Sequence, residues 1–119
     1  MNASPPRRLI LIVDDESDIR DILGDALVDE GYRVACAADG QEALELVAAE
    51  VPDLIVSDIK MPRVHGLTLI ERVRELGHTM PVVLISTWTP PDLPGVQFVA
   101  KPFDLDDITA AIELSLADA

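Results

Sequence analysis

The chain has 119 residues, 49% of them hydrophobic, and its 22 acidic residues outnumber nine lysines and arginines, giving a formal net charge of −13. This length predicts one domain with its own core, and the hydrophobic content excludes an intrinsically disordered chain. The negative charge argues against nucleic acid as a direct partner, because binding the phosphate backbone requires clustered lysine and arginine.

The sequence also indicates a compartment. No apolar run approaches the roughly 18 residues of a membrane span, and residues 1–8 are too polar for a signal peptide. Cys36 is the single cysteine, which excludes an internal disulfide and fits a reducing environment. We therefore expect a cytoplasmic protein with no membrane partner.

Strand-like and helix-like segments alternate along the chain. A continuous run of β-branched residues and leucine predicts a strand at 9–13, and further short, mostly apolar segments predict strands at 33–37, 54–57, 82–85 and 96–100. Apolar residues at a spacing near 3.6 predict helices at 16–30, at 64–76 and from 104 onward, and Asp39 with Glu42 predicts a capped helix that Pro52 ends. This alternation predicts an α/β fold in which a parallel sheet has helices on both faces.

The predicted helices each carry a set of apolar side chains expected to face the core. In the helix at 16–30 they are Ile19, Ile22, Leu23, Ala26 and Leu27, and in the helix that Asp39 caps they are Ala43, Leu44 and Val47. In the helix at 64–76 they are Leu69, Val73 and Leu76, and in the last helix they are Leu105, Ile108, Ile112 and Leu116.

One connection is too short for a helix. Only residues 87–95 separate the fourth and fifth strands, and they include Pro90, Pro91 and Pro94. A crossover with a helix usually takes ten or more residues, and prolines disfavour helix formation. Nine extended residues reach roughly 30 Å, enough to return along a strand of about 17 Å. We therefore predict an irregular Pro-rich segment, or at most a turn, in place of this helix.

Polar residues that could handle a phosphoryl group stand at four strand ends. Asp14 and Asp15 follow the first strand, Asp58 the third, Ser86 the fourth and Lys101 the fifth. Each alone has an ordinary explanation as a helix cap, a turn residue, a strand-end hydroxyl or a surface charge. Because open α/β sheets bind ligands at the carboxyl edge, their joint occurrence predicts one site.

The residue types suggest a chemistry for that site. Three clustered carboxylates repel each other and resist full ionisation unless a cation joins them, and Mg²⁺ prefers such oxygen ligands. A carboxylate can attack phosphorus to form an acyl phosphate. Lys101 could neutralise phosphoryl oxygens, and the Ser86 hydroxyl could donate a hydrogen bond to a bound phosphoryl group.

At these residues the sequence resembles the response-regulator receiver domain of two-component signalling. The resemblance rests on Ile-Val-Asp-Asp-Glu at 12–16, Asp-Ile-Lys-Met-Pro at 58–62 with Gly66, Ser86 after an apolar strand, and Lys-Pro-Phe at 101–103. It covers residues 8–117, which leaves 1–7 as an expected flexible tail. It implies a flavodoxin-like, doubly wound sheet of five parallel strands in the order 2-1-3-4-5.

The resemblance implies roles for the acidic residues. Asp58 would be the phosphoacceptor, charged by a histidine kinase or a histidine phosphotransfer protein. Asp15, Asp58 and the backbone carbonyl of Lys60 would bind Mg²⁺ directly, while Asp14 would act through a metal-bound water.

It also implies roles at the later strands. Lys101 would contact the phosphoryl group, Ser86 would be the switch hydroxyl, and Phe98 matches the aromatic switch position. The bond between Lys101 and Pro102 is commonly cis in the family, as the small cis penalty of proline permits.

Three features depart from the family pattern. Thr87 stands where a small residue is usual and could restrict access to the phosphoryl group. The Lys60 side chain could reach over the site and tune phosphoryl lifetime. The missing helix matters most, because the family commonly signals through a surface that this helix forms with the fifth strand and the last helix. That surface cannot be standard here.

Other notable residues have simpler interpretations. His65 and His78 lack zinc-ligand spacing and are expected at the surface. Trp88 would either anchor the irregular segment by packing or belong to a partner surface. The charged residues of the third helix, Glu71, Arg72, Arg74 and Glu75, are expected to form a solvated face.

Three functions remain to be compared. The first is a signalling module that phosphorylation switches and that acts by protein–protein contact or as a phosphate relay. The second is a constitutive protein-binding module that no longer switches. The third is a Mg²⁺-dependent phosphohydrolase, which the absence of a capping domain and of a second carboxylate two residues after Asp58 argues against.

Overall fold

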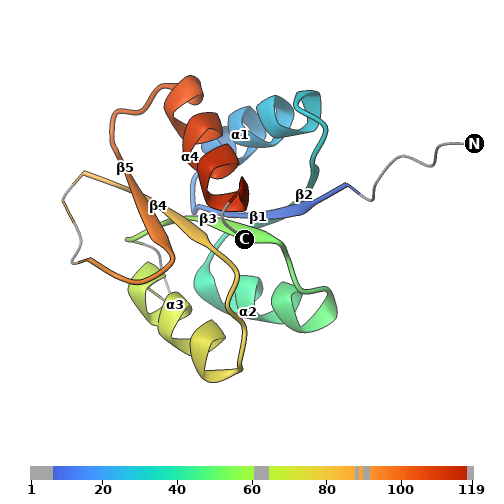
Figure 1. Ribbon diagram of the computed structural model, residues 1–119, viewed down its shortest axis with the longest axis vertical. Coiled ribbons are helices and arrows are strands. Elements are labelled where there is room, and N and C mark those ends of the chain that lie inside the picture. The colour runs from blue at the N-terminus through green and yellow to red at the C-terminus, as the bar shows by residue number, and fades with distance from the viewer. Residues whose placement is uncertain (1–6, 61–64, 88, 90–91, 118–119) are drawn as a thin grey trace, which may run out of the picture.

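The computed structural model describes residues 7–60, 65–87, 89 and 92–117 (Figure 1). Its strands are β1 (Leu9–Val13), β2 (Arg33–Ala37), β3 (Leu54–Asp58), β4 (Val82–Ser86) and β5 (Val96–Ala100). Its helices are α1 (Ser17–Asp29), α2 (Gly40–Ala49), α3 (Gly66–Glu75) and α4 (Leu105–Ala117).

The strands form one parallel sheet in the order β2-β1-β3-β4-β5, as the sequence predicted. The residues of β1 and β4 are all buried, which explains why these strands read as continuous apolar runs. The register pairs Val13 with Ser57 and Ser86 with Ala100. This alignment brings the carboxyl ends of neighbouring strands to one edge of the sheet.

Two helices cover each face of the sheet. Figure 1 shows α1 and α4 on one side of the sheet and α2 and α3 on the other. Alternate residues of β1 serve both cores, because successive side chains of a strand point to opposite faces. Leu11 and Val13 pack with α2 and α3, whereas Ile10 and Ile12 pack with α1 and α4. The sheet edge that carries the site is therefore held between two packed layers.

The connection from β4 to β5 contains no helix or strand among its described residues, 87, 89 and 92–95. It ends at Gly95, whose φ of +73° is the left-handed conformation that glycine adopts readily. The predicted absence of a helix here is therefore confirmed, and α4 is the helix that follows β5. Trp88, Pro90 and Pro91 lie outside the described residues, so the prediction for Trp88 stays open.

The helix boundaries and their inward faces were predicted with a few errors. The Asp39 side chain accepts a hydrogen bond from the backbone N–H of Glu42 at 2.9 Å, which confirms the cap of α2. Ile22, Leu76 and Leu105 are exposed, although they were expected to face the core. Leu76 comes directly after the last residue of α3 and Leu105 is the first residue of α4, so each stands at a helix end. On α1, Leu23 and Leu27 make the buried stripe and Ile22 lies beside it.

The charged face predicted for α3 was also partly wrong. Arg74 is only partly exposed, and its guanidinium donates to the backbone carbonyls of His78 at 3.2 Å and of Met80 at 2.8 Å. Glu71, Arg72 and Glu75 are exposed as expected. In the part of the chain that is described, no helix combines the length and the hydropathy that crossing a membrane requires.

Candidate functional site

Three carboxylates gather at the carboxyl edge of the sheet. Asp14 and Asp15 follow β1, and Asp58 is the last residue of β3. Carboxylate oxygens of the three residues lie within 4.8 Å of one another. They meet because β1 and β3 are neighbours and end at the same level of the sheet. The structure thus brings together the acidic residues that the sequence placed at one edge.

Asp14 is held rigidly at the base of this cluster. Only 2% of its surface is exposed, its Oδ1 accepts from the backbone N–H of Glu16 at 2.9 Å, and its own N–H donates to the Ala37 carbonyl at 3.1 Å. The guanidinium of Arg20 donates to the Asp14 carbonyl at 2.7 Å. The sequence analysis missed Arg20, because a contact to a backbone carbonyl leaves no residue-type signature.

The electrostatics of the cluster favour a cation. Burial raises the pKa of Asp14 from 3.8 to about 6, with a further contribution from the charge of Asp58, although the Glu16 N–H and Lys101 act in the opposite direction. Such a shift means that ionising Asp14 beside the other carboxylates is unfavourable in the protein alone. A positive charge at the cluster would relieve this penalty.

Lys101 supplies one positive charge. Its ammonium donates to Oδ2 of Asp58 at 3.0 Å, and its backbone N–H donates to the Ser86 carbonyl at 2.8 Å. Burial alone lowers the pKa of Lys101, but the hydrogen bond and charge of Asp58, with the charges of Asp14 and Glu16, outweigh it and raise the pKa overall. The side chain is therefore an ammonium at neutral pH. The peptide bond to Pro102 is cis.

The other predicted site residues lie on β4 and β5 or follow β3 and β4. Ser86 ends β4 and is buried, and Thr87, the next residue, is exposed. Phe98 on β5 is half-buried and pairs in register with Leu84. Lys60 is exposed two residues after Asp58. The geometry gathers Ser86 with Lys101 at the edge, whereas Phe98 lies farther back along β5.

Gly66 fits tightly against the backbone of Asp58. Its N–H donates to the Ile59 carbonyl at 2.8 Å. A Cβ at position 66 would lie 2.4 Å from the Asp58 carbonyl oxygen and 2.9 Å from the Ile59 Cα. Glycine thus lets the first turn of α3 approach the phosphoacceptor candidate, which gives a physical reason for Gly66 in the motif.

Gly66→Ala should lower the free energy of unfolding by about 1–3 kcal/mol, because the new methyl group overlaps backbone atoms that cannot move freely. Gly24→Ala is the matched control, since its Cβ would only touch Val34 at 3.8 Å within α1. We expect that control to be neutral or to raise stability by about 0.5–1 kcal/mol. Urea unfolding measures both, and equal effects would contradict the tight contact at Gly66.

Stability should depend on the ionisation of Asp14 in Mg²⁺-free buffer. Because its folded-state pKa of about 6 exceeds its ordinary value of 3.8, the protonated form favours folding and stability falls as the pH rises through 6. Asp14→Asn removes this titration while its amide oxygen can still accept from Glu16. We expect the variant and the wild type to match near pH 4 and the variant to be more stable by up to about 3 kcal/mol above pH 7. Urea unfolding in EDTA tests this, and parallel pH profiles would contradict it.

The donor set fits a hard divalent cation. Three carboxylates supply oxygen ligands and negative charge that one ammonium does not balance. Asp15 is exposed and Asp58 partly exposed, so solvent and a phosphate can reach the cluster. Mg²⁺ keeps several waters and binds through one or two carboxylates plus phosphate oxygens, which matches this open arrangement.

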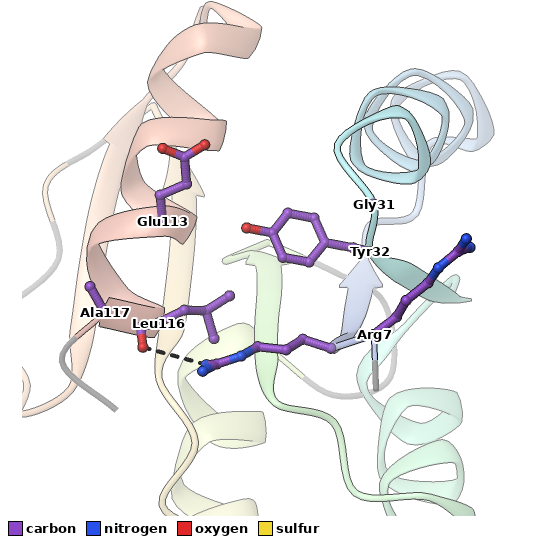
Figure 2. A pocket seen from close by; sticks show the side chains of 7 residues that line it. Arg7, Gly31, Tyr32, Glu113, Leu116 and Ala117 are labelled. Carbon is purple, nitrogen blue, oxygen red and sulfur yellow. Dashed lines mark hydrogen bonds between the residues drawn. The ribbon is translucent and has the colours of Figure 1, made fainter. Parts of the chain in front are cut away.

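A separate hollow of about 530 Å³ lies at the opposite edge of the sheet, where β1 and β2 begin. Figure 2 shows Tyr32 and Glu113 on its two sides. The Arg8 guanidinium donates to the Leu116 carbonyl at 3.4 Å. No residue of the acidic cluster lines it. It therefore plays no part in chemistry at Asp58.

Comparison with known proteins assigns the family. Residues 10–113 match the response regulator receiver domain. The chain belongs to this family. Receiver domains are signalling domains of two-component systems, they interact with histidine kinases or phosphotransfer proteins, and they bind Mg²⁺ at an acidic pocket like the one described above.

The chain matches nearly the whole of one relative and a smaller part of another. It is 34% identical over 111 residues to sporulation initiation phosphotransferase F of Bacillus subtilis, covering 90% of that protein and 87% of this chain. It is 36% identical to the transcriptional regulatory protein PdtaR of Mycobacterium tuberculosis, where the match takes in 98% of this chain and 60% of that protein.

Solved receiver structures share the fold. The chemotaxis protein CheY4 of Vibrio cholerae aligns with a TM-score of 0.85 at 28% identity, over 92% of this chain and 99% of that one. The receiver domain of the hybrid histidine kinase CckA aligns with a TM-score of 0.81 at 35% identity, over 91% of this chain and 98% of that one. The order of the strands and the packing of helices on both faces of the sheet are therefore those of the family.

Proposed function

We propose that this chain is a phosphorylation-switched signalling module in which Asp58 accepts a phosphoryl group. The contact between the Lys101 ammonium and Oδ2 of Asp58, within a cluster of three carboxylates, carries this proposal. It places a nucleophilic oxygen and a compensating positive charge at the open edge of the sheet. A histidine kinase or a histidine phosphotransfer protein would supply the phosphoryl group.

In the proposed reaction a carboxylate oxygen of Asp58 attacks the phosphorus of a phosphohistidine. An O–P bond forms, the N–P bond breaks, and its electron pair stays on the imidazole nitrogen, which takes up a proton. Asp15, Asp58 and the backbone carbonyl of Lys60 would hold Mg²⁺, with Asp14 acting through a water. When bound, this ion neutralises charge on the transferred oxygens.

The chain's own residues then stabilise the product. Lys101 neutralises phosphoryl oxygen charge from the position where it now contacts Asp58. The Ser86 hydroxyl donates to a phosphoryl oxygen, and Phe98 on the adjacent β5 changes its packing with it. Thr87, exposed beside Ser86, and the exposed Lys60 limit how water approaches the phosphoryl group.

Acetyl phosphate provides a direct test. With Mg²⁺, we expect the intact chain to gain the mass of one phosphoryl group, and hydroxylamine should remove it because acyl phosphates are labile to this nucleophile. With EDTA in place of Mg²⁺, the adduct should not accumulate. Absence of an adduct with Mg²⁺ present, or an adduct resistant to hydroxylamine, would refute the proposal.

A constitutive protein-binding module is the second candidate. The connection between β4 and β5, which lacks a helix in its described residues, favours it, because the usual signalling surface is incomplete. This alternative predicts identical backbone amide spectra with and without beryllofluoride, a phosphoryl mimic. A switching module predicts shifts at Ser86 and along β5.

A further inference from the structure

A groove lies between α3 and the β4–β5 connection. Its volume is about 560 Å³. One wall is a single stripe of α3, formed by Leu67, Ile70 and the residues at 71, 74 and 75, at the spacing of one helix face. The other wall is Leu93 and Pro94 from the β4–β5 connection. We call it the α3 groove.

The α3 groove has an apolar floor that nothing in the described chain fills. Leu67 and Leu93 are partly buried hydrophobic residues that pack against the core between the sheet and α2 and α3. Arg74 also lines the groove, and its Nη2 lies 3.4 Å from where a Cβ at Gly95 would stand. An amphipathic helix of two or three turns matches a stripe of this length, because nine residues of a helix span about 13 Å.

Acidic side chains at the rim of the groove favour a helix with positively charged residues beside its apolar face. Glu71 and Glu75 are exposed along one wall, and Asp92 is exposed beside Leu93 on the other. The guanidinium of Arg74 is turned to the carbonyls of His78 and Met80 instead of the rim. The chain as a whole carries a net charge of −13, which attracts cationic partners and opposes pairing with a second copy of itself.

We propose that the α3 groove docks an amphipathic helix of a partner protein, with apolar residues against Leu67, Ile70 and Leu93 and lysine or arginine residues facing Glu71 and Glu75. This surface takes over the output role that the missing helix leaves vacant. That output role rests on the proposed function. Ser86 is the last residue of β4, and Leu93 lies in the connection that follows it, so a change at Ser86 can reach the groove.

A designed peptide tests the docking without any phosphodonor. The probe is a fluorescein-labelled peptide of about 18 residues, with leucines spaced three and four apart and lysines elsewhere, long enough to form a helix. We expect it to bind by fluorescence anisotropy, whereas a peptide with glutamates in place of the lysines, and a scrambled lysine peptide, should not. Equal binding of the scrambled peptide would overturn the proposal.

Charge reversal locates the binding surface. Glu71→Lys with Glu75→Lys should weaken the lysine peptide about tenfold and allow the glutamate peptide to bind. The matched control is Asp21→Lys with Asp25→Lys, which changes the net charge equally on α1, across the sheet, and should change affinity less than about twofold. Equal weakening by both pairs would show attraction by net charge alone and overturn the groove as the site.

Apolar substitutions test the floor of the groove. Leu93→Gln should weaken the lysine peptide about tenfold, whereas Leu114→Gln, at an exposed leucine on α4, should not. Backbone amide shifts on peptide addition should map to α3 and residues 92–95. Shifts confined to β5 and α4, or dimerisation of the chain through the groove, would overturn the assignment.

Coupling to phosphorylation is measured with the same peptide. Beryllofluoride with Mg²⁺ should change its affinity about fivefold or more in the wild type and not in Asp58→Asn. Because docking is first measured without a phosphodonor, failure of phosphorylation at Asp58 leaves that result intact. Unchanged binding in the Glu71 and Leu93 variants overturns the docking even if Asp58 is phosphorylated.

Discussion

Replacing Asp58 by asparagine should abolish phosphorylation by acetyl phosphate. The amide lacks the nucleophilic carboxylate oxygen, and the substitution removes one of the three carboxylates of the acidic cluster. Asn is nearly isosteric with Asp, so the variant should keep the fold and still donate or accept hydrogen bonds at this position. Intact-mass spectrometry after incubation with acetyl phosphate and Mg²⁺ measures the loss.

Asp29→Asn is the control for this substitution. Asp29 is the last residue of α1 and is exposed, and it lies outside the acidic cluster. The control should therefore be phosphorylated at the wild-type rate. An adduct that persists at full occupancy in Asp58→Asn would show that another residue is the phosphoacceptor.

Replacing Lys101 by methionine should slow phosphorylation about 100-fold, because the transferred oxygens lose a preorganised positive charge. Methionine keeps an unbranched apolar stem of similar length, so the packing of that stem changes little. In Mg²⁺-free buffer the variant should also lose about 1–3 kcal/mol of stability, since the partly buried Asp58 carboxylate loses its ion-pair partner.

The matched control removes a positive charge elsewhere. Arg72→Met on the exposed face of α3 changes net charge equally and should leave both the phosphorylation rate and the stability near the wild-type values. Rates come from the time course of the phosphorylated mass, and stabilities from urea unfolding. A Lys101→Met rate within about twofold of the wild type would contradict a direct role in stabilising transferred charge.

The sequence predicted the sheet and the convergence of polar residues at its carboxyl edge, because both depend on strong local signals. The central strands β1 and β4 are buried along their whole length, so they appear as uninterrupted apolar runs, and the polar residue that follows each run marks the carboxyl edge. The strand order that the family resemblance implied then brings Asp14, Asp58 and Lys101 together at that edge. The absence of a helix among the described residues of the β4–β5 connection followed from the length of that connection and its prolines.

Other features depend on tertiary contacts that sequence patterns do not encode. Arg20 and Arg74 bind backbone carbonyls, and any residue type can offer a carbonyl. Leu76 and Leu105 continue an apolar spacing to the ends of their helices, where the side chains are exposed, so periodicity alone placed them inside. The tight fit of Gly66 under Asp58 needed coordinates, although the glycine itself stood in the recognised motif.

The position of the phosphoryl group is the central claim and can be measured directly. Borohydride reduces an aspartyl phosphate to homoserine, and tandem mass spectrometry of the digested protein then identifies the residue. We predict homoserine at position 58 alone, after incubation with acetyl phosphate and Mg²⁺. Homoserine at position 14 or 15, or a borohydride-resistant phosphate on Ser86 or His65, would contradict the mechanism.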